Sequence, residues 1–330
     1  MKQKTALVLG AGGFIASHMA TQLKKENYFV RGVDLKYPEF SKTSCDEFII
    51  GDLRDTKVVE EVMSIRGGFS ECYQYAEFMG GATFIFTGDN DADIIESSHL
   101  INANIANCAI KYRVGKLFYS SSACIYPLNI QEDVDNKGLK ESDAFPANCD
   151  SDYGFAKLST EKLYMAYHKN YDLDIRIARF HNIFGVEGTW DGIKAKAPAS
   201  IARKVAIANN FESIEILGDG LQTRSFLDIQ ECTQGVRKLM NSNFTAPINI
   251  GSDEMISIND LAKMVIGFSG KNLVIKNVES NALGVRGRNS DNTLCESVLG
   301  WKPTQPLEVG MRKLYEWVNS EVQKNKQANG

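Results

Sequence analysis

The chain has 330 residues, of which 43% are hydrophobic and 24% charged, and its formal net charge is -4 at pH 7. These proportions are typical of a globular protein and exclude fibrous or disordered chains, and this length usually forms one large and one smaller domain. The slightly acidic balance provides no basic field for nucleic acid, although it permits a local basic pocket for a phosphorylated ligand.

Neither a membrane segment nor a signal peptide is predicted. Residues 1–5 lead directly into a short strand pattern, and no apolar run approaches the ~18 residues of a membrane span. The seven cysteines are scattered and form no Cys-x-x-Cys pair, which favours reduced thiols over disulfides or a zinc site. We therefore expect a cytoplasmic protein without a metal.

The first half of the chain alternates between strands and helices. Residues 5–9 are a predicted strand, 10–13 a glycine turn, 14–25 a helix and 28–33 a second strand. This βαβ unit implies parallel strands in one sheet. The alternation continues with strands at 47–50, 71–75, 116–120 and 174–179, and with helices at 58–65, 94–112 and 153–170.

The pattern loosens after residue 180. Residues 185–196 are glycine-rich and polar, which suits a binding loop; helices are predicted at 199–208, at 258–268 and from 307, and strands at 214–216 and 273–278. The polar tail from residue 323 is expected to fray. The fold class is therefore α/β: a Rossmann-type, doubly wound parallel sheet in residues 1–180, joined by segments returning from about 220–250, and a smaller substrate-binding domain in residues 181–330.

A dinucleotide site is indicated by Gly10-x-x-Gly13-x-x-Ala16, placed between a strand and a helix, with Asp34 at the end of the next strand. Gly10 permits the tight turn, Gly13 lets the backbone approach a pyrophosphate, and the helix N-terminus favours its charge. Asp34 can accept hydrogen bonds from ribose hydroxyls and would repel a 2′-phosphate, which favours NAD over NADP. The alternative is a glycine turn that serves only as a connector.

A catalytic pair is indicated by Tyr153 and Lys157, which lie four residues apart and so share one face of a helix. A lysine ammonium and a positive nicotinamide ring both favour a phenolate, which brings the phenol pKa toward working pH. Ser122, at the end of the strand that begins at residue 116, could hydrogen-bond the same substrate oxygen. The alternative is a surface pair without chemistry.

Longer strings resemble a known family. The arrangement resembles the extended short-chain dehydrogenase/reductase family, and within it the GDP-mannose 3,5-epimerase group. This resemblance implies a homodimeric, NAD-dependent epimerase of a GDP-hexose, acting by transient oxidation at C4 and epimerisation at C3 or C5. The strings that carry it include GAGGFIASH (10–18), SSACIYP (121–127), ARFHNIFG (178–185), GDGLQTRSF (218–226) and GVRGRNSDN (284–292).

Residue roles follow from this resemblance by position. Cys124 and Lys196 would be the acid/base pair, and a thiol near a cation could be a thiolate at neutral pH. The implied cofactor-binding residues are Gly10, Gly13, Phe14, Ile15, Asp34, Asp52, Leu53, Tyr153 and Lys157. The implied substrate-binding residues are Gly81, Ser122, Cys124, Asn182, Lys196, Lys204, Gln222, Thr223, Arg224 and Arg288.

Several alternatives stay open. Arg224 and Arg288 suit a diphosphate because a guanidinium binds it bidentately, but either could form a surface salt bridge, and Arg286 is a rival to Arg288. Cys124 could be a small buried hydrophobic residue without a catalytic role, and Asp52 could be an exposed turn residue.

The matching epimerases read LAADMGG where this chain reads YAEFMGG (75–81), so an acidic side chain has either moved or been lost, and Glu77 is a candidate replacement. Other functions on the same scaffold are a 4-epimerase, a 4-oxidase or 4-reductase, and a non-catalytic NAD-binding protein.

Overall fold

The computed structural model describes residues 3–192, 194–280 and 284–328. Its centre is a seven-stranded sheet in the order β11-β6-β5-β4-β1-β2-β3, and neighbouring strands pair in parallel. The predicted α/β fold with a Rossmann-type sheet is therefore confirmed. The strands are β1 (Thr5–Leu9), β2 (Phe29–Asp34), β3 (Glu47–Ile50), β4 (Glu71–Gln74), β5 (Lys116–Ser122), β6 (Ile175–Phe180) and β11 (Pro247–Ile250).

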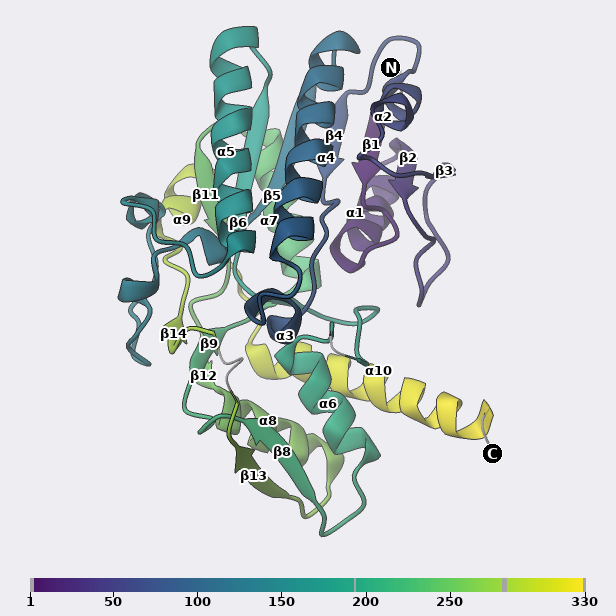
Figure 1. The fold of residues 1–330 in the computed structure, drawn as a ribbon. Helices are drawn as coiled ribbons and strands as arrows, with labels where there is room; N and C mark the ends of the chain where they lie inside the picture. The colour runs from purple at the N-terminus through teal and green to yellow at the C-terminus, as the bar shows by residue number, and fades with distance from the viewer. Residues whose placement is uncertain (1–2, 193, 281–283, 329–330) are drawn as a thin grey trace.

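Helices cover both faces of this sheet (Figure 1). In β1, Ala6 and Val8 join the core beneath α1 (Phe14–Lys25) and α7 (Ile229–Asn241), while Leu7 and Leu9 join the core beneath α2, α4 and α5. Successive side chains of a strand point to opposite faces, so a strand buried on both sides must be apolar throughout. The helices of the second face are α2 (Thr56–Met63), α4 (Asp91–Lys111) and α5 (Asp152–Tyr171).

The segments α7 and β11 lie late in the chain but belong to the sheet layer. The strand β11 pairs in parallel with β6, and α7 packs in the same core as α1. The expectation of a return to the sheet at about 220–250 corresponds to this part of the chain.

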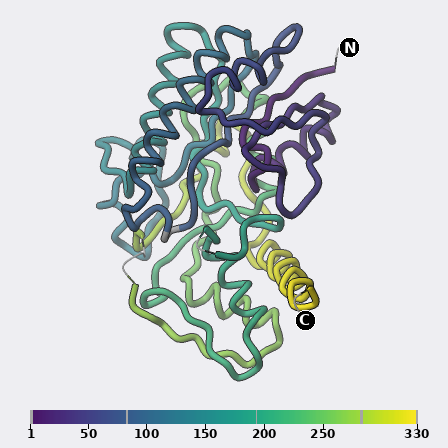
Figure 2. Tube along the Cα trace, turned by 45° about the vertical axis from the view of Figure 1, so that its right-hand side comes forward, coloured from purple at the N-terminus to yellow at the C-terminus, as the bar shows by residue number. Residues whose placement is uncertain are grey.

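The remaining C-terminal segments form a second apolar core. It joins α6 (Ala197–Ile207), α8 (Ile258–Ser269) and α10 (Leu307–Ala328) with the parallel pair β8 (Ser213–Leu217) and β13 (Val274–Val278). Figures 1 and 2 show these elements below the sheet layer, with α10 extending to one side.

The prediction that the tail frays from residue 323 is wrong, because α10 continues to Ala328. Its buried Val322 anchors this turn to the second core.

Small irregular elements that sequence patterns did not predict connect the two layers. They include α3 (Ala82–Phe86), the 3-10 helix η1 (Ala123–Ile125), the pair β7 (Ile183–Phe184) and β10 (Leu227–Asp228), and the three-stranded sheet of β12 (Met255–Ser257), β9 (Thr223–Ser225) and β14 (Gly287–Arg288). Elements of two to five residues are too short to show a period.

The helix α5 is fixed rigidly against the sheet. Ser151 caps its N-terminus by accepting a hydrogen bond from the Gly154 amide at 3.2 Å. Further along, Glu161 accepts hydrogen bonds from Arg179 on β6 at 2.8 and 3.0 Å and from Ser121 on β5 at 2.5 Å. The middle of α5 is thus held by Glu161 at the carboxyl ends of β5 and β6. In the part of the chain described, no helix is long and apolar enough to cross a membrane.

Candidate active site

The glycine turn after β1 leaves no room for side chains. Gly10 has φ +82°, and a Cβ at this residue would lie 2.8 Å from the Ala76 amide nitrogen. A Cβ at Gly12 would lie 2.0 Å from the main-chain oxygen of Lys36. Gly13 caps α1 without any side-chain hydrogen bond, so the first amides of the helix stay accessible for an anion. The turn therefore fits a dinucleotide pyrophosphate, and Gly12 is a member that the sequence analysis missed.

Asp34 stands at the end of β2, beside this turn. Its Oδ2 accepts a hydrogen bond from the Gly12 amide at 2.9 Å, and its Oδ1 accepts one from the Lys36 amide at 3.3 Å. Burial raises the pKa of Asp34, while these amide hydrogen bonds act in the opposite direction. A carboxylate has about four acceptor positions, so Asp34 keeps capacity for ribose hydroxyls.

The other predicted cofactor-binding residues lie in different environments. Phe14, in the first turn of α1, stacks edge-on against His18 at 5.4 Å, and Ile15 packs on the core beneath α1. Asp52 pairs with Arg54 at 2.6 Å in an exposed turn, which matches the alternative reading of this residue. Leu53 is buried in the core on the α2 face.

Tyr153 and Lys157 lie together, buried in the first turns of α5. The Lys157 ammonium donates a hydrogen bond to the Ser120 carbonyl at 2.9 Å and lies 5.6 Å from the centre of the Tyr153 ring. It also forms an ion pair with Glu77 at 2.7 Å, and both side chains are 3% exposed. The predicted pair is therefore a buried triad of ionisable groups.

The pKa of Tyr153 is raised well above its ordinary value. Burial is the largest cause, and the charges of Glu77 and Cys124 add to it, whereas a hydrogen bond with Ser122 acts in the opposite direction. Among these protein groups, burial and then the charge of Glu77 therefore outweigh the lowering of the phenol pKa that was expected from Lys157.

Cys124 lies in η1, directly against the first turn of α5. A Cβ at Gly154 would come within 2.2 Å of the Cys124 carbonyl oxygen, which shows how closely the two segments pack. Arg288 on β14 donates a hydrogen bond to the Cys124 Sγ at 3.4 Å, pairs with Asp150 at 2.5 Å and donates to Gln131 at 2.6 Å. The arginine thus holds segments from both layers of the molecule around the thiol.

Lys196 approaches the same thiol from the second core, where it caps the N-terminus of α6. Burial lowers the pKa of Lys196, and a negative charge on Cys124 acts in the opposite direction. Burial also raises the pKa of Cys124, with Asp150 adding to the rise and Arg288 opposing it. Among the protein groups, burial thus acts against the thiolate that the sequence analysis considered, and Arg288 acts in its favour.

The two arginines that the sequence analysis offered for the diphosphate, Arg286 and Arg288, differ in burial. Arg288 is buried beside Cys124, whereas Arg286 is half-buried and pairs with Asp219 at 2.9 Å. Arg224 donates a hydrogen bond to the Val285 carbonyl at 2.6 Å, and burial together with the charge of Arg288 lowers its pKa to about 9. Arg224, whose charge is disfavoured by burial and by Arg288, would be stabilised by an anionic ligand.

The remaining predicted substrate residues differ in what they offer. Gln222 is buried, and its Oε1 has no hydrogen-bond partner among the described residues, so it can still accept one. The Asn182 amide donates to the Ser225 carbonyl at 2.9 Å, and Lys204 donates to the Glu215 carbonyl at 2.6 Å. Gly81 begins α3. Asn182 and Lys204 therefore brace the second layer in this conformation.

Asp150 and Gln131 were missed as parts of the site. Both are buried and hold Arg288, yet they belong to irregular segments in which polar residues normally face solvent. Asp150 directly precedes the helix cap Ser151, which was the one local hint.

This combination of a parallel sheet, a glycine turn with an acidic residue on the next strand, and a Tyr–Lys pair on a buried helix defines an NAD-dependent dehydrogenase-type enzyme. The family model described as "NAD dependent epimerase/dehydratase family" matches residues 6–251, and the chain belongs to this family.

Relatives within the family are more specific. The chain is 44% identical to GDP-mannose 3,5-epimerase of Arabidopsis thaliana, over 97% of this chain and 83% of that protein. It is 42% identical to GDP-mannose 3,5-epimerase 1 of Oryza sativa subsp. japonica, over 97% and 82%. The predicted resemblance to this group is therefore confirmed.

Solved structures agree on the fold. UDP-glucose 4-epimerase of Thermotoga maritima superposes with a TM-score of 0.84 at 23% identity, covering 96% of this chain and 99% of that one. UDP-glucuronic acid 4-epimerase of Bacillus cereus, solved with UDP-glucuronic acid and NAD, gives 0.79 at 23% identity, with the same two coverages.

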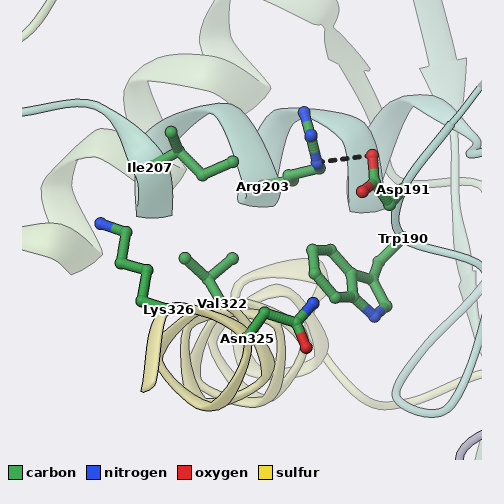
Figure 3. A pocket seen from close by; sticks show the side chains of 7 residues that line it. All are labelled: Trp190, Asp191, Arg203, Ile207, Val322, Asn325 and Lys326. Carbon is green, nitrogen blue, oxygen red and sulfur yellow. Dashed lines mark ion pairs between the residues drawn. The ribbon is translucent and has the colours of Figure 1, made fainter. Parts of the chain in front are cut away.

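A separate groove of about 420 Å³ lies between α6 and α10 (Figure 3). It is lined by Trp190, Asp191, Arg203, Ile207, Val322, Asn325 and Lys326, and none of these is a predicted site residue. Arg203 and Asp191 are paired across its edge at 2.8 Å. The groove is thus a surface feature distinct from the Tyr153 site.

Proposed function

We propose that this protein is an NAD-dependent sugar-nucleotide epimerase that oxidises C4 of the hexose transiently and inverts C3, C5 or both. GDP-mannose or a related GDP-sugar is the proposed substrate, supported by the similarity to the plant GDP-mannose 3,5-epimerases. The observation that supports the proposal is that Cys124 packs against Gly154 beside Tyr153 and that its charge would act on both Tyr153 and Lys196, two groups that can transfer protons.

The residues fit NAD as the cofactor. Gly10, Gly12 and the open N-terminus of α1 would hold the pyrophosphate, and Asp34 would accept hydrogen bonds from the adenosine ribose. Bound NAD supplies a hydride acceptor next to C4 and returns the hydride at the end of the cycle.

The protein groups would act on the sugar as follows. Tyr153 takes the proton of the C4 hydroxyl, with Ser122 hydrogen-bonded to the same phenol. A ketone at C4 then acidifies the protons on C3 and C5, because each carbanion is stabilised as an enolate. Cys124 and Lys196 would remove a proton from one face of the ring and deliver one to the other.

The two groups are shifted differently relative to working pH. Burial lowers the pKa of Lys196 toward working pH, which suits a group that gives and takes a proton. Burial raises the pKa of Cys124, so its thiol favours the protonated form that can deliver a proton. Arg288 and Arg224 would donate hydrogen bonds to the diphosphate, and Gln222 Oε1 could accept one from a hydroxyl or N–H group of the ligand.

We also propose a homodimer that forms through α4 and α5. These helices pack side by side on the same face of the sheet (Figure 1), and they expose Leu100, Phe155 and Tyr171 by 44%, 46% and 58%. Exposed apolar side chains on neighbouring helices are typical of an interface. Sedimentation analysis tests this: a monomer at micromolar concentration would contradict it.

Incubation with GDP-mannose in D₂O, with the products resolved by NMR, tests the enzymatic proposal. We expect carbon-bound deuterium at C3, C5 or both and no net NADH. A product without label would refute enolisation and favour a 4-epimerase, and stoichiometric NADH would favour a 4-oxidase. Cys124→Ser should keep NAD binding and lose most labelling, whereas Cys149→Ala, at a neighbouring buried cysteine, should label like wild type.

A further inference from the structure

Glu77 is a buried carboxylate that the proposed reaction does not use. It follows β4 in the segment that touches the glycine turn, where a Cβ at Gly10 would lie 2.9 Å from Ala76 Cα. Its Oε2 lies 2.7 Å from the Lys157 ammonium, and both side chains are 3% exposed. Glu77 therefore lies between the phosphate-binding turn and the Tyr–Lys pair.

A comparison with a second buried ion pair shows that Glu77 is unusual. Glu161 pairs with Arg179 and is satisfied at both oxygens by hydrogen bonds from Arg179 and Ser121. Glu77 Oε1, in contrast, has no hydrogen-bond partner among the residues described. An unsatisfied buried carboxylate oxygen is costly, and a structural ion pair would normally be fully hydrogen-bonded.

The position of this charge gives it a function. Without Glu77, the buried ammonium of Lys157 would face the cationic nicotinamide of NAD⁺ as an unbalanced like charge. The Glu77–Lys157 pair is close to neutral, so it removes that repulsion from the oxidised cofactor and hardly affects the neutral ring of NADH.

We propose that Glu77 is a positioning residue of the catalytic centre, whose fixed negative charge makes the site favour oxidised over reduced nicotinamide dinucleotide. This inference rests on the proposed function, because an epimerase must recover NAD⁺ in every turnover. A site that held NADH much more tightly would accumulate the reduced cofactor and the ketone.

The same charge also sets the protonation of Tyr153. The ionisable groups that face this phenol are Glu77 before α3, Tyr119 on β5, Cys124 in η1, Asp150 before α5 and Lys157 on α5 itself. Glu77 raises the pKa of Tyr153. Its removal should therefore lower that pKa and move the acid limb of the pH–rate profile to lower pH.

Equilibrium binding of NAD⁺ and NADH to the full-length protein, stripped of bound dinucleotide, tests the inference without any sugar. We expect Glu77→Gln to lower the ratio of NAD⁺ to NADH affinity about tenfold, as a unit charge acting through an effective dielectric constant of about 20 can do. Lys157→Met should raise the ratio, and the double variant, in which both charges are absent, should return it toward wild type. Glu77→Asp, which keeps the charge, is the matched control.

The double variant also guards against misfolding, because replacing both members of a buried pair costs much less than removing one. The inference would be overturned if the ratio of NAD⁺ to NADH affinity were the same in wild type, Glu77→Gln and the double variant. It would also be overturned if the wild-type protein bound neither dinucleotide. The pH dependence of turnover gives a second readout: Glu77→Gln should shift the acid limb down by about one unit, and Glu77→Asp should not. An altered affinity ratio with no solvent label in wild type would support the role of Glu77 and refute only the proposed epimerisation.

Discussion

The buried pair of Arg288 and Asp150 should make a large, strongly coupled contribution to stability. Asp150 is 0% exposed and Arg288 7%, and the guanidinium and carboxylate are 2.5 Å apart. Removing one member of such a pair leaves an uncompensated charge in the interior, which costs about 3–5 kcal/mol. Arg288→Met and Asp150→Asn should therefore each remove a large share of the free energy of unfolding, which is typically about 5–15 kcal/mol for a protein.

The double variant Asp150→Asn/Arg288→Met separates the pair from its surroundings. It should recover most of the lost stability, because no unpaired charge remains, and the coupling energy should exceed about 2 kcal/mol. Urea unfolding followed by circular dichroism measures all four proteins, and Arg286→Gln at the neighbouring half-buried arginine should unfold near wild type. Additive losses in the double variant, or single variants as stable as Arg286→Gln, would refute the reasoning.

Three further outcomes are expected. Gly12→Ala should weaken NAD⁺ binding about tenfold by calorimetry, because its Cβ would lie 2.0 Å from the Lys36 oxygen; Gly267→Ala, with open space around it, is the control and should bind normally. Asp34→Ser should raise NADP affinity relative to NAD, since a carboxylate repels the 2′-phosphate, and an unchanged ratio would contradict this. Burial lowers the pKa of His181 to about 3, so only the unfolded chain gains a proton as pH falls below ~6.5, and stability is lost from there downward. Urea midpoints of wild type should therefore fall more steeply toward acid pH than those of His181→Gln, and parallel curves would exclude the effect.

The regular part of the fold could be predicted because its elements are long and buried on defined faces. The strands β1 to β6 and the helices α1, α2, α4 and α5 appear where the apolar patterns place them, with ends shifted by a few residues, whereas β11 was expected only as part of a segment returning to the sheet. The tail of α10 was misjudged because the residues from 323 onward are polar, whereas the preceding turn, with Val322, packs into the second core and the helix continues to Ala328. Burial against distant segments is not visible in local composition.

The site could be predicted only as far as its chemistry is local in sequence. Gly10, Asp34, Tyr153 and Lys157 belong to motifs with fixed spacing, and the structure brings the glycine turn and the Tyr–Lys pair to the same edge of the sheet. The environment of Cys124 could not be anticipated, because Arg288 lies 164 residues away and burial outweighs its charge. The pKa of such a group is set by residues that are distant in sequence, and the spacing of a local motif does not predict them.

The layer that supplies each side chain suggests how oxidation at C4 and proton exchange at C3 and C5 are divided between the two layers. Tyr153, Lys157 and Glu77 all belong to the sheet layer and are fixed by contacts within it. Lys196 and Arg288, in contrast, enter from α6 and β14 and meet Cys124 only where the second layer adjoins the first. In the proposed reaction, oxidation at C4 would therefore depend on groups of the sheet layer alone, while proton exchange at C3 and C5 would depend on how the two layers meet. A shift between the layers would change the second kind of step while leaving the first intact, so a family with one redox centre can acquire different sugar chemistries by altering the segments that face it.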